Sequence, residues 1–364
     1  MRFVLALILA SCGRIHFDPG GTTGSGDDDG DGGDAFVLPP NTNIMFVTST
    51  LVDFVALRSL ADADAECRAR ASAAGLPGTY IAWLSTSTAA AGSRLTGDGW
   101  IRPDGKPFAR TRAELLAGYT LYVPTLNEYA QDVGKTSPAT ATRSDGTFDS
   151  SGDSCGALTG SGTITIGDSM SGGAFWTDIG DTVPCTSNPI FCFSTDYTNP
   201  LVTTPPAVQR LAFVSSQAFT MGGGIASADA YCQNEAAAAG FPGTFLALVA
   251  MSTASAASRY DLTGPPWYRV DGIPIVRVAS DLASSSLIAP LDLDSTGTLQ
   301  GGVSLVSTGS HSLASVADEN CSDWMASTGS DYQTTGGPFY ADKRYIGAGR
   351  AQCTGYTRLY CLQQ

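Results

Sequence analysis

Two copies of one short motif hold the side chains whose types and spacing best suit ligand recognition. In each copy a Trp, an Arg and an Asp stand two residues apart, and a Gly follows the Asp directly. The six residues are Trp100, Arg102 and Asp104, and then Trp267, Arg269 and Asp271. An indole face beside an ion pair can stack on a sugar ring or hold a peptide. A structural role is the simpler hypothesis, in which the Trp packs beneath a hairpin, Asp-Gly forms the turn and the Arg pairs with a nearby acid.

Residue types for acid-base catalysis and metal binding are scarce. The chain has two His residues, His16 and His311, and neither lies in the first copy of the repeat described below. Equivalent Ser-His-Asp triads therefore cannot occur in both copies, and a His-rich metal site is disfavoured. We predict a protein that is not an enzyme and that needs no metal or other cofactor. One enzymatic alternative stays open, a glycoside hydrolase-like reaction between paired carboxylates in a cleft.

The two motifs belong to a longer segment that occurs twice in the sequence. Matching segments recur at an offset of 165 to 167 residues, so that Phe46-Val47-Thr48-Ser49 returns as Phe213-Val214-Ser215-Ser216. Chance similarity between low-complexity stretches would not keep one register across Trp, Arg, Pro and Cys. We therefore predict two copies of one module, at 44–193 (module 1) and 211–364 (module 2), with a Pro- and Thr-rich linker at 194–210.

The cysteines follow the same register. Each module holds four, at intervals of 88, 30 and 7 residues in module 1 and of 89, 32 and 8 in module 2. They are Cys67, Cys155, Cys185 and Cys192, and then Cys232, Cys321, Cys353 and Cys361. In an exported protein four cysteines per module predict two disulfides, and zinc is disfavoured because Cys-x-x-Cys spacing and accompanying His residues are missing. The residues alone leave three pairings per module open.

The ninth cysteine, Cys12, belongs to the N-terminal segment. Residues 1–11 have a positive start at Arg2 and a short apolar run, which is typical of a signal peptide. Leu9-Ala10-Ser11-Cys12 resembles the lipobox of bacterial lipoproteins. The resemblance implies cleavage before Cys12, lipidation of its thiol and attachment to a membrane. No Asp follows Cys12, which by the same analogy favours the outer membrane or the cell surface.

Residues 12–43 predict an acidic tether rich in Gly and Asp. Its Asp run lacks the Glu that closes a calcium-binding loop, so a solvated, flexible spacer is favoured over a calcium site. Six Asp and one Arg in this segment contribute −5 of the net charge of −14. With 20 Lys and Arg against 34 Asp and Glu, the whole chain is a poor candidate for binding nucleic acid.

Local patterns predict the elements around the motifs. Ser59 and Ser227 are expected to cap helices at 61–74 and 228–239, each ended by a glycine. Apolar runs at 80–84 and 245–249 predict buried strands. Structural roles are expected for four other charged residues. Arg94 and Arg259 should form ion pairs, and Asp64 and Asp229 should form hydrogen bonds to a loop backbone.

The pattern resembles a known family. A Phe-Val-x-Ser strand, an Ala-Asp-x-x-Cys helix, a Gly-x-x-Gly-Thr-Phe segment and a closing Leu-Tyr-Cys look like endostatin. They look still more like a bacterial lipoprotein domain of unknown function that is distantly akin to it. The resemblance covers nearly all of both modules and implies an α+β, C-type-lectin-like fold, rich in loops and stapled by disulfides. It also implies nested disulfides: Cys67–Cys192 around Cys155–Cys185, and Cys232–Cys361 around Cys321–Cys353.

Departures from these relatives limit what the resemblance implies about ligands. Neither module begins with the histidines of the endostatin zinc site, and the acidic chain lacks an arginine-rich surface for heparin. The Glu-Pro-Asn, Gln-Pro-Asp and Trp-Asn-Asp triplets with which lectins of this fold hold calcium are also missing. Zinc, heparin and calcium-dependent glycan binding are therefore not carried over.

Together these observations favour an exported, lipid-anchored surface protein whose two modules bind an extracellular protein or glycan without catalysis. The alternative is a structural component of the cell envelope without a specific ligand. The oligomeric state and the relative orientation of the modules do not follow from the sequence.

Overall fold

The computed structural model describes residues 38–152, 154–158, 160–207, 209–284, 286–300 and 305–364. This part of the chain has a mixed α+β fold with four disulfides. The predicted signal peptide, the lipidation site Cys12 and most of the acidic tether lie outside the described residues. No helix among the described residues has the length and apolar character needed to cross a membrane.

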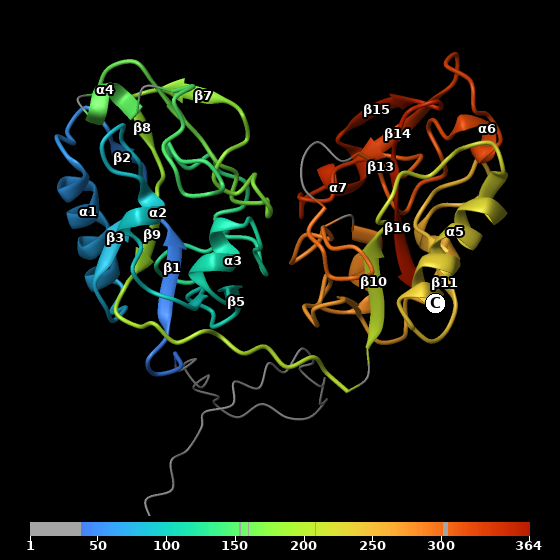
Figure 1. The fold of residues 1–364 in the computed structure, drawn as a ribbon, viewed down its shortest axis with the longest axis horizontal. Helices are drawn as coiled ribbons and strands as arrows, with labels where there is room; N and C mark the ends of the chain where they lie inside the picture. The colour runs from blue at the N-terminus through green and yellow to red at the C-terminus, as the bar shows by residue number, and fades with distance from the viewer. Residues whose placement is uncertain (1–37, 153, 159, 208, 285, 301–304) are drawn as a thin grey trace, which may run out of the picture.

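Module 1 is built on a five-stranded sheet in the order β3-β9-β1-β4-β5 (Figure 1). Strand β1 lies at its centre, parallel to β4 and antiparallel to β9. The strands of module 1 are β1 (Asn43–Val47), β2 (Val52–Asp53), β3 (Tyr80–Ala82), β4 (Trp100–Ile101), β5 (Pro107–Ala109), β6 (Thr163–Thr165), β7 (Thr182–Pro184), β8 (Ser187–Asn188) and β9 (Phe191–Ser194). The helices are α1 (Leu60–Ala73), α2 (Ala91–Arg94), α3 (Arg112–Leu116) and α4 (Ser154–Leu158).

Every residue of β1 is buried, because both faces of the sheet are covered. Ile44 and Phe46 point toward the cluster that includes Cys67 of α1, while Met45 and Val47 join an aromatic cluster on the opposite face. This alternation is what the two-residue period of a strand requires. From Ile44 to Val47 the strand is therefore apolar on both faces. Its first residue, Asn43, is also buried, and its side-chain amide donates to the backbone oxygens of Asp98 and Tyr197.

Module 2 repeats the central strands of module 1 in the same register. Its strands β11, β16, β10 and β12 correspond to β3, β9, β1 and β4, and β13, β14 and β15 extend the sheet beyond β16. Phe213 of β10 pairs with Cys361, as Phe46 pairs with Cys192 in module 1. The elements are β10 (Arg210–Val214), α5 (Gly224–Ala238), β11 (Phe245–Ala247), the 3-10 turns η1 (Ala257–Arg259) and η2 (Ala279–Ser284), β12 (Trp267–Arg269), β13 (Val306–Ser307), α6 (Cys321–Trp324), β14 (Tyr332–Gly336), α7 (Arg344–Gly347), β15 (Gly349–Gln352) and β16 (Arg358–Gln363).

The predicted helix cap is correct in module 1 and wrong in module 2. Ser59 caps α1 and accepts a hydrogen bond from the backbone N–H of Asp62. In module 2 the helix begins at Gly224, three residues before the predicted cap Ser227, which lies inside the first turn. The extra turn carries Ile225, which packs against the apolar cluster around Cys232, so burial of this side chain extends the helix.

The disulfides join the cysteines in the nested order that the resemblance implied. Cys67–Cys192 and Cys232–Cys361 tie α1 to β9 and α5 to β16, across 125 and 129 residues of chain. Cys155–Cys185 and Cys321–Cys353 close loops of 30 and 32 residues within them. Each inner disulfide starts from a left-handed turn, α4 or α6, in which non-glycine residues have φ between 49° and 68°. Such turns cost energy for L-residues, so the surrounding module must hold them in place.

The two modules pack directly against each other. Segment 168–175 of module 1 pairs with segment 339–344 of module 2 through Gly172 N–H to Phe339 O at 2.8 Å and Ala341 N–H to Met170 O at 2.9 Å. Arg344 forms an ion pair with the buried Asp168 at 2.6 Å across the same junction. These contacts use backbone pairing and a buried charge, so they fix one orientation of the modules.

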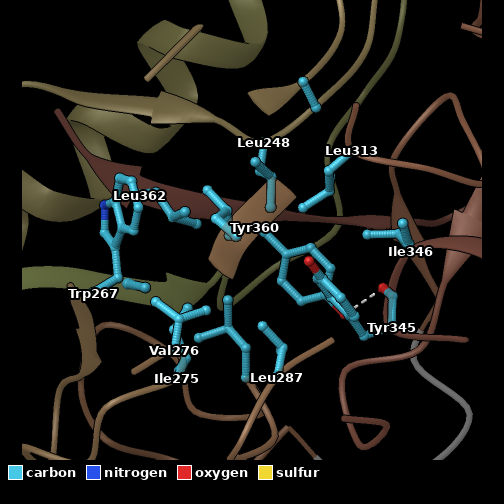
Figure 2. Close-up of a cluster of buried hydrophobic side chains, with 14 of the residues drawn as sticks. Leu248, Trp267, Ile275, Val276, Leu287, Leu313, Tyr345, Ile346, Tyr360 and Leu362 are labelled. Atoms are coloured by element: carbon cyan, nitrogen blue, oxygen red, sulfur yellow. Dashed lines mark hydrogen bonds between the residues drawn. The ribbon is translucent and has the colours of Figure 1, made fainter. Parts of the chain in front are cut away.

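Apolar residues of both modules complete this junction. Val123 of module 1 belongs to the largest cluster of module 2, whose centre around Tyr345 and Tyr360 is drawn in Figure 2. The Tyr360 hydroxyl donates to the backbone oxygen of Tyr345 at 2.9 Å. A smaller cluster joins side chains from both modules: Leu121 and Tyr122 with Ile273 and Ala289. The modules therefore share a core, which a long flexible linker alone would not produce.

Candidate ligand site between the two modules

The Arg-x-Asp-Gly motif of module 1 is a tight turn with a fixed ion pair. Gly105, at φ +79°, donates its N–H to the backbone oxygen of Arg102 at 2.9 Å, a conformation that costs glycine little. The Asp104 carboxylate accepts from Arg102 Nη2 at 2.6 Å and Nε at 3.2 Å, and from the backbone N–H of Lys106 at 3.2 Å. Arg102 Nη1 donates to the backbone oxygen of Val123 at 2.8 Å. The guanidinium is thereby held in one orientation.

The motif of module 2 has the same internal geometry. Gly272, at φ +83°, donates to the backbone oxygen of Arg269 at 2.9 Å. Asp271 accepts from Arg269 Nη2 at 2.6 Å and from Nε at 3.1 Å. Arg269 Nη1 donates to the backbone oxygen of Pro290 at 3.2 Å, as Arg102 does to Val123. The predicted turn and ion pair are present in both modules.

The two tryptophans of the motifs lie in the cores. Trp100 and Trp267 have no exposed surface, and their indole N–H groups donate to the backbone oxygens of Ser194 at 2.9 Å and Gln363 at 2.7 Å. Trp100 packs edge-on against Phe193 at a ring-centroid distance of 5.8 Å. Neither indole presents a face to a ligand, and both have the packing role that was the simpler hypothesis.

Arg102 and Asp104 instead line a pocket between the two modules. Its volume is about 310 Å³, near the lower end of the range for small-molecule sites. Module 1 contributes Arg102, Asp104, Lys106, Val123, Thr125, Leu126, Ala130, Asp132 and Met170, and module 2 contributes Arg277, Ser286, Leu287 and Ile288. The pocket thus exists only because the modules are packed together. We refer to it as the junction pocket.

The lining of the junction pocket combines aliphatic walls with charged side chains. Its cations are Arg102, Lys106 and Arg277, and its anions are Asp104 and Asp132. Lys106 Nζ lies 3.9 Å from the Asp104 carboxylate and 5.5 Å from the centre of the Tyr122 ring. Burial lowers the pKa of Lys106, and the negative charge of Asp104 opposes this shift. The ammonium side chain is 36% exposed, so a ligand can reach it.

The equivalent arginine of module 2 is sealed inside the junction. The side chain of Arg269 is 1% exposed, and its Nη1 also donates to the backbone oxygen of Thr120 in module 1 at 3.2 Å. A second carboxylate, Asp292, accepts from the same nitrogen at 3.0 Å and is fully buried. Arg269 therefore has two carboxylate partners and a contact that holds module 1 in place.

Burial strongly affects the pKa values of the two carboxylates beside Arg269, Asp271 and Asp292. Desolvation raises the pKa of Asp292 to about 7, although the Arg269 guanidinium opposes the shift. Burial would raise the pKa of Asp271 as well, but the charge of Arg269 outweighs it and holds this pKa below its usual value. The two carboxylates therefore share one cation unequally, and Asp271 is the one that stays ionised at acidic pH.

The predicted structural ion pairs are confirmed in both modules. Arg94 contacts Asp64 at 2.5 Å, and Arg259 contacts Asp229 at 2.6 Å. Each aspartate also bonds a backbone group, as expected, but in a strand and not in a loop: it accepts from the N–H of Ala82 at 2.9 Å in module 1 and of Ala247 at 3.0 Å in module 2. These pairs tie the main helix of each module to the neighbouring strand and are not part of the junction pocket.

Two other hollows lie on module 1, with volumes of about 440 and 610 Å³. They are lined mainly by Ser, Thr, Gly and Ala, and they contain none of the six residues selected from the sequence. Within the described ranges no group of three or more His, Cys, Asp or Glu side chains could hold a metal ion. The junction pocket is therefore our candidate site.

Sequence reasoning missed Thr125, Lys106 and Asp292, which distinguish the two modules. A signal was available, because the offset of 167 residues places Thr125 opposite Asp292 and Lys106 opposite Ile273. A comparison of the modules for differences, in addition to similarities, would have selected these positions.

A scan against protein-family models finds no model that matches the chain. A search of curated proteins finds no sequence that is significantly similar to it.

Proposed function

We propose that the chain is an exported, lipid-anchored surface protein in which two endostatin-like, C-type-lectin-like modules form one rigid binding unit. Its ligand would be an extracellular protein or glycan, bound without catalysis. The paired modules, each with a helix packed on a sheet and two nested disulfides, support the assignment of the modules. Four disulfides also favour an oxidising compartment outside the cytoplasm.

One observation carries the binding function: the junction pocket contains an oriented, largely buried guanidinium beside aliphatic walls. The Arg102 side chain is 8% exposed and is held by Asp104 and by the backbone of Val123. Pre-oriented charged groups in a partly desolvated pocket are typical of ligand sites, because little ordering remains to be done when the ligand binds.

The same geometry supports binding over hydrolysis. A glycosidase needs two carboxyl groups facing the reacting bond, one of which must act as an acid. In the junction pocket both oxygens of Asp104 are engaged by Arg102, and Asp132 accepts from the backbone N–H of Gly134 at 2.8 Å. Because Asp104 is engaged by Arg102, the pocket does not offer the pair of unengaged carboxyl groups that this reaction requires.

Surface display is tested with cells that express the full chain. Replacement of Cys12 by Ser should release the protein from the membrane fraction, and a protease added to intact cells should degrade the wild-type protein. Retention of Cys12→Ser in membranes would contradict the lipid anchor.

Ligand binding is tested with the soluble double module on protein and glycan arrays. We expect a ligand whose binding decreases when Arg102 is replaced by Gln. Silence on every array would contradict a binding function and would favour a structural component of the cell envelope.

A further inference from the structure

The two Arg-x-Asp motifs can be compared position by position, because the surrounding backbone has the same register. Val47 donates its N–H to Leu126 O at 3.0 Å, and Val214 donates to Leu293 O at 2.9 Å. The offset of 167 residues therefore holds through the segment next to each arginine. Thr125 in module 1 thus occupies the position of Asp292 in module 2.

This substitution leaves Arg102 with less negative charge than Arg269. In module 2, Asp292 supplies a carboxylate to Arg269 Nη1 at 3.0 Å in addition to Asp271. In module 1 the uncharged Thr125 stands at that position, and the ion pairs of Arg102 with described residues are limited to Asp104. In module 2 this position therefore supplies a second carboxylate, whereas in module 1 the uncharged and largely buried Thr125 stands there, in the wall of the junction pocket.

Two further cations reinforce this difference. Lys106 stands where module 2 has the buried Ile273, and it faces the same pocket as Arg102. Arg277 reaches the pocket from module 2, with a side chain that is 72% exposed and bonded to Asp281 at 3.4 Å. Three cationic side chains thus line a pocket of about 310 Å³ that has two carboxylates, Asp104 and Asp132, so the lining has an excess of one positive charge. Such an arrangement favours an anionic ligand.

The rest of the lining indicates what the anion is attached to. The walls are formed by aliphatic and thioether side chains: Val123, Leu126, Met170, Leu287 and Ile288. Among the described lining residues none is aromatic, so they offer no stacking face for a sugar ring. Asp132 is exposed and supplies an acceptor for an N–H group beside the anion.

We propose that the junction pocket binds the carboxylate of a ligand with a short aliphatic body, as at the C-terminus of a peptide that ends in an aliphatic residue. The ligand carboxylate lies in the pocket beside Arg102 and Thr125, and supplies the second negative charge that Asp292 supplies to Arg269. Lys106 adds a second positive charge, the aliphatic walls receive the side chain, and Asp132 accepts the terminal amide N–H. This inference rests on the proposed binding function and names the ligand chemistry of that site.

The first test compares three small ligands by calorimetric titration and by NMR of the full chain. N-acetyl-L-leucine carries the carboxylate, N-acetyl-L-leucinamide is its neutral counterpart, and glucuronate is an acidic sugar. We expect N-acetyl-L-leucine to bind and to shift the Met170 methyl signal, and the amide to bind at least ~10-fold more weakly. Equal binding of acid and amide, binding of glucuronate alone, or no binding by any of the three would overturn the proposal.

The second test fills the site with a carboxylate from the protein itself. Thr125→Asp copies Asp292 into module 1 and should weaken N-acetyl-L-leucine binding at least ~10-fold. Thr186→Asp makes the same charge change at an exposed position on another face of module 1 and should leave binding unchanged. Thr125→Val, which removes the hydroxyl without adding charge, controls for changes in packing at this lining residue and should weaken binding much less than Thr125→Asp.

Unchanged binding by Thr125→Asp, or an equal loss in Thr125→Val, would refute the carboxylate site. Different results would contradict the carboxylate site and the general binding function. If an array ligand binds Thr125→Asp as well as wild type, the carboxylate proposal fails and the binding function stands. If no array ligand exists, the binding function fails regardless of small-molecule titrations.

Discussion

The two Arg-x-Asp-Gly turns have nearly the same geometry and opposite surroundings. In module 1 the ion pair lines an open pocket, and the Asp104 carboxylate is 26% exposed. In module 2 the pair is enclosed by module 1, and its arginine meets two carboxylates and the Thr120 backbone oxygen. The same repeated pattern thus holds the modules together in module 2 and lines a candidate ligand site in module 1. Duplicated motifs therefore need to be assessed with their neighbours and not by their own residues alone.

Replacing Arg269 or Arg102 by Ala should give the largest difference in the free energy of unfolding between equivalent positions of the two modules. Arg269→Ala leaves Asp271 and Asp292 buried without a cation and should lower the free energy of unfolding by roughly 3–5 kcal/mol. Arg102→Ala leaves an aspartate that water can reach, and a loss of about 1–2 kcal/mol is expected. Urea unfolding without reductant measures both. Equal losses would mean that the two motifs have the same structural role.

Lys106 and Ile273 occupy equivalent positions in the two modules, and exchanging their residue types tests whether each position is buried or faces the pocket. Ile273→Lys places a charge in the apolar cluster that joins the modules and should cost about 2–4 kcal/mol. Lys106→Ile, the reverse exchange in the open pocket, should change stability by no more than about 1 kcal/mol. A large loss in Lys106→Ile would show that the lysine supports the fold and not the pocket.

The pH dependence of stability should include a contribution from Asp292 of module 2 that the equivalent Thr125 of module 1 cannot make. The folded-state pKa of Asp292, about 7, lies above its value of about 4 in an unfolded chain, so the folded state binds an extra proton in this interval. The stability contributed by Asp292 is therefore present below about pH 4 and is lost as the pH rises toward 7, with a slope of at most about 1.4 kcal/mol per pH unit.

Asp292→Asn should remove this slope, because its carbonyl oxygen still accepts from Arg269 but does not titrate. Urea unfolding of wild type and variant across this pH range measures the difference. The same profile in both proteins would assign the pH dependence to other groups.

The ion pairs Asp64–Arg94 and Asp229–Arg259 should contribute equally to the stability of the two modules. Asp64→Asn and Asp229→Asn each remove an ion pair with an arginine while keeping an acceptor for the strand N–H, and each should cost about 1–2 kcal/mol. The two losses should agree within roughly 0.5 kcal/mol. Thermal unfolding of the two variants checks this, and a clear inequality would show that the modules differ in their cores as well as at the junction.

Much of each module was predictable from local sequence. The helix of module 1 follows from a Ser cap, a run of Ala and a closing Gly, all of which act within a few residues. The Asp-Gly turn and the apolar strands follow from the same short-range rules. An ion pair was expected for Arg94, but its pairing with Asp64, 30 residues away, was decided by the tertiary structure. The start of α5 was predicted incorrectly because burial of Ile225, a contact distant in sequence, outweighed the nearby Ser227.

The candidate site was only half predictable. Arg102 and Asp104 were selected from the sequence, but so were Trp100 and Trp267, whose burial depends on how the strands close over them. The left-handed turns at Cys155 and Cys321 also have no local signal, since most of their residues are not glycine. Long-range packing holds such conformations, and a reading of neighbouring residues does not detect it.

The amino-acid sequence by itself determined the number of modules, their registers and their charged turns, because these depend on spacing and on short-range hydrogen bonds. Only the tertiary structure decided that the modules share a core, that Arg269 is enclosed and that Arg102 faces a pocket. The reason is physical. Whether the Arg-Asp ion pair holds the modules together or faces a ligand depends on the water and the opposite charges around it. These are set by segments more than a hundred residues away, such as Thr120 beside Arg269.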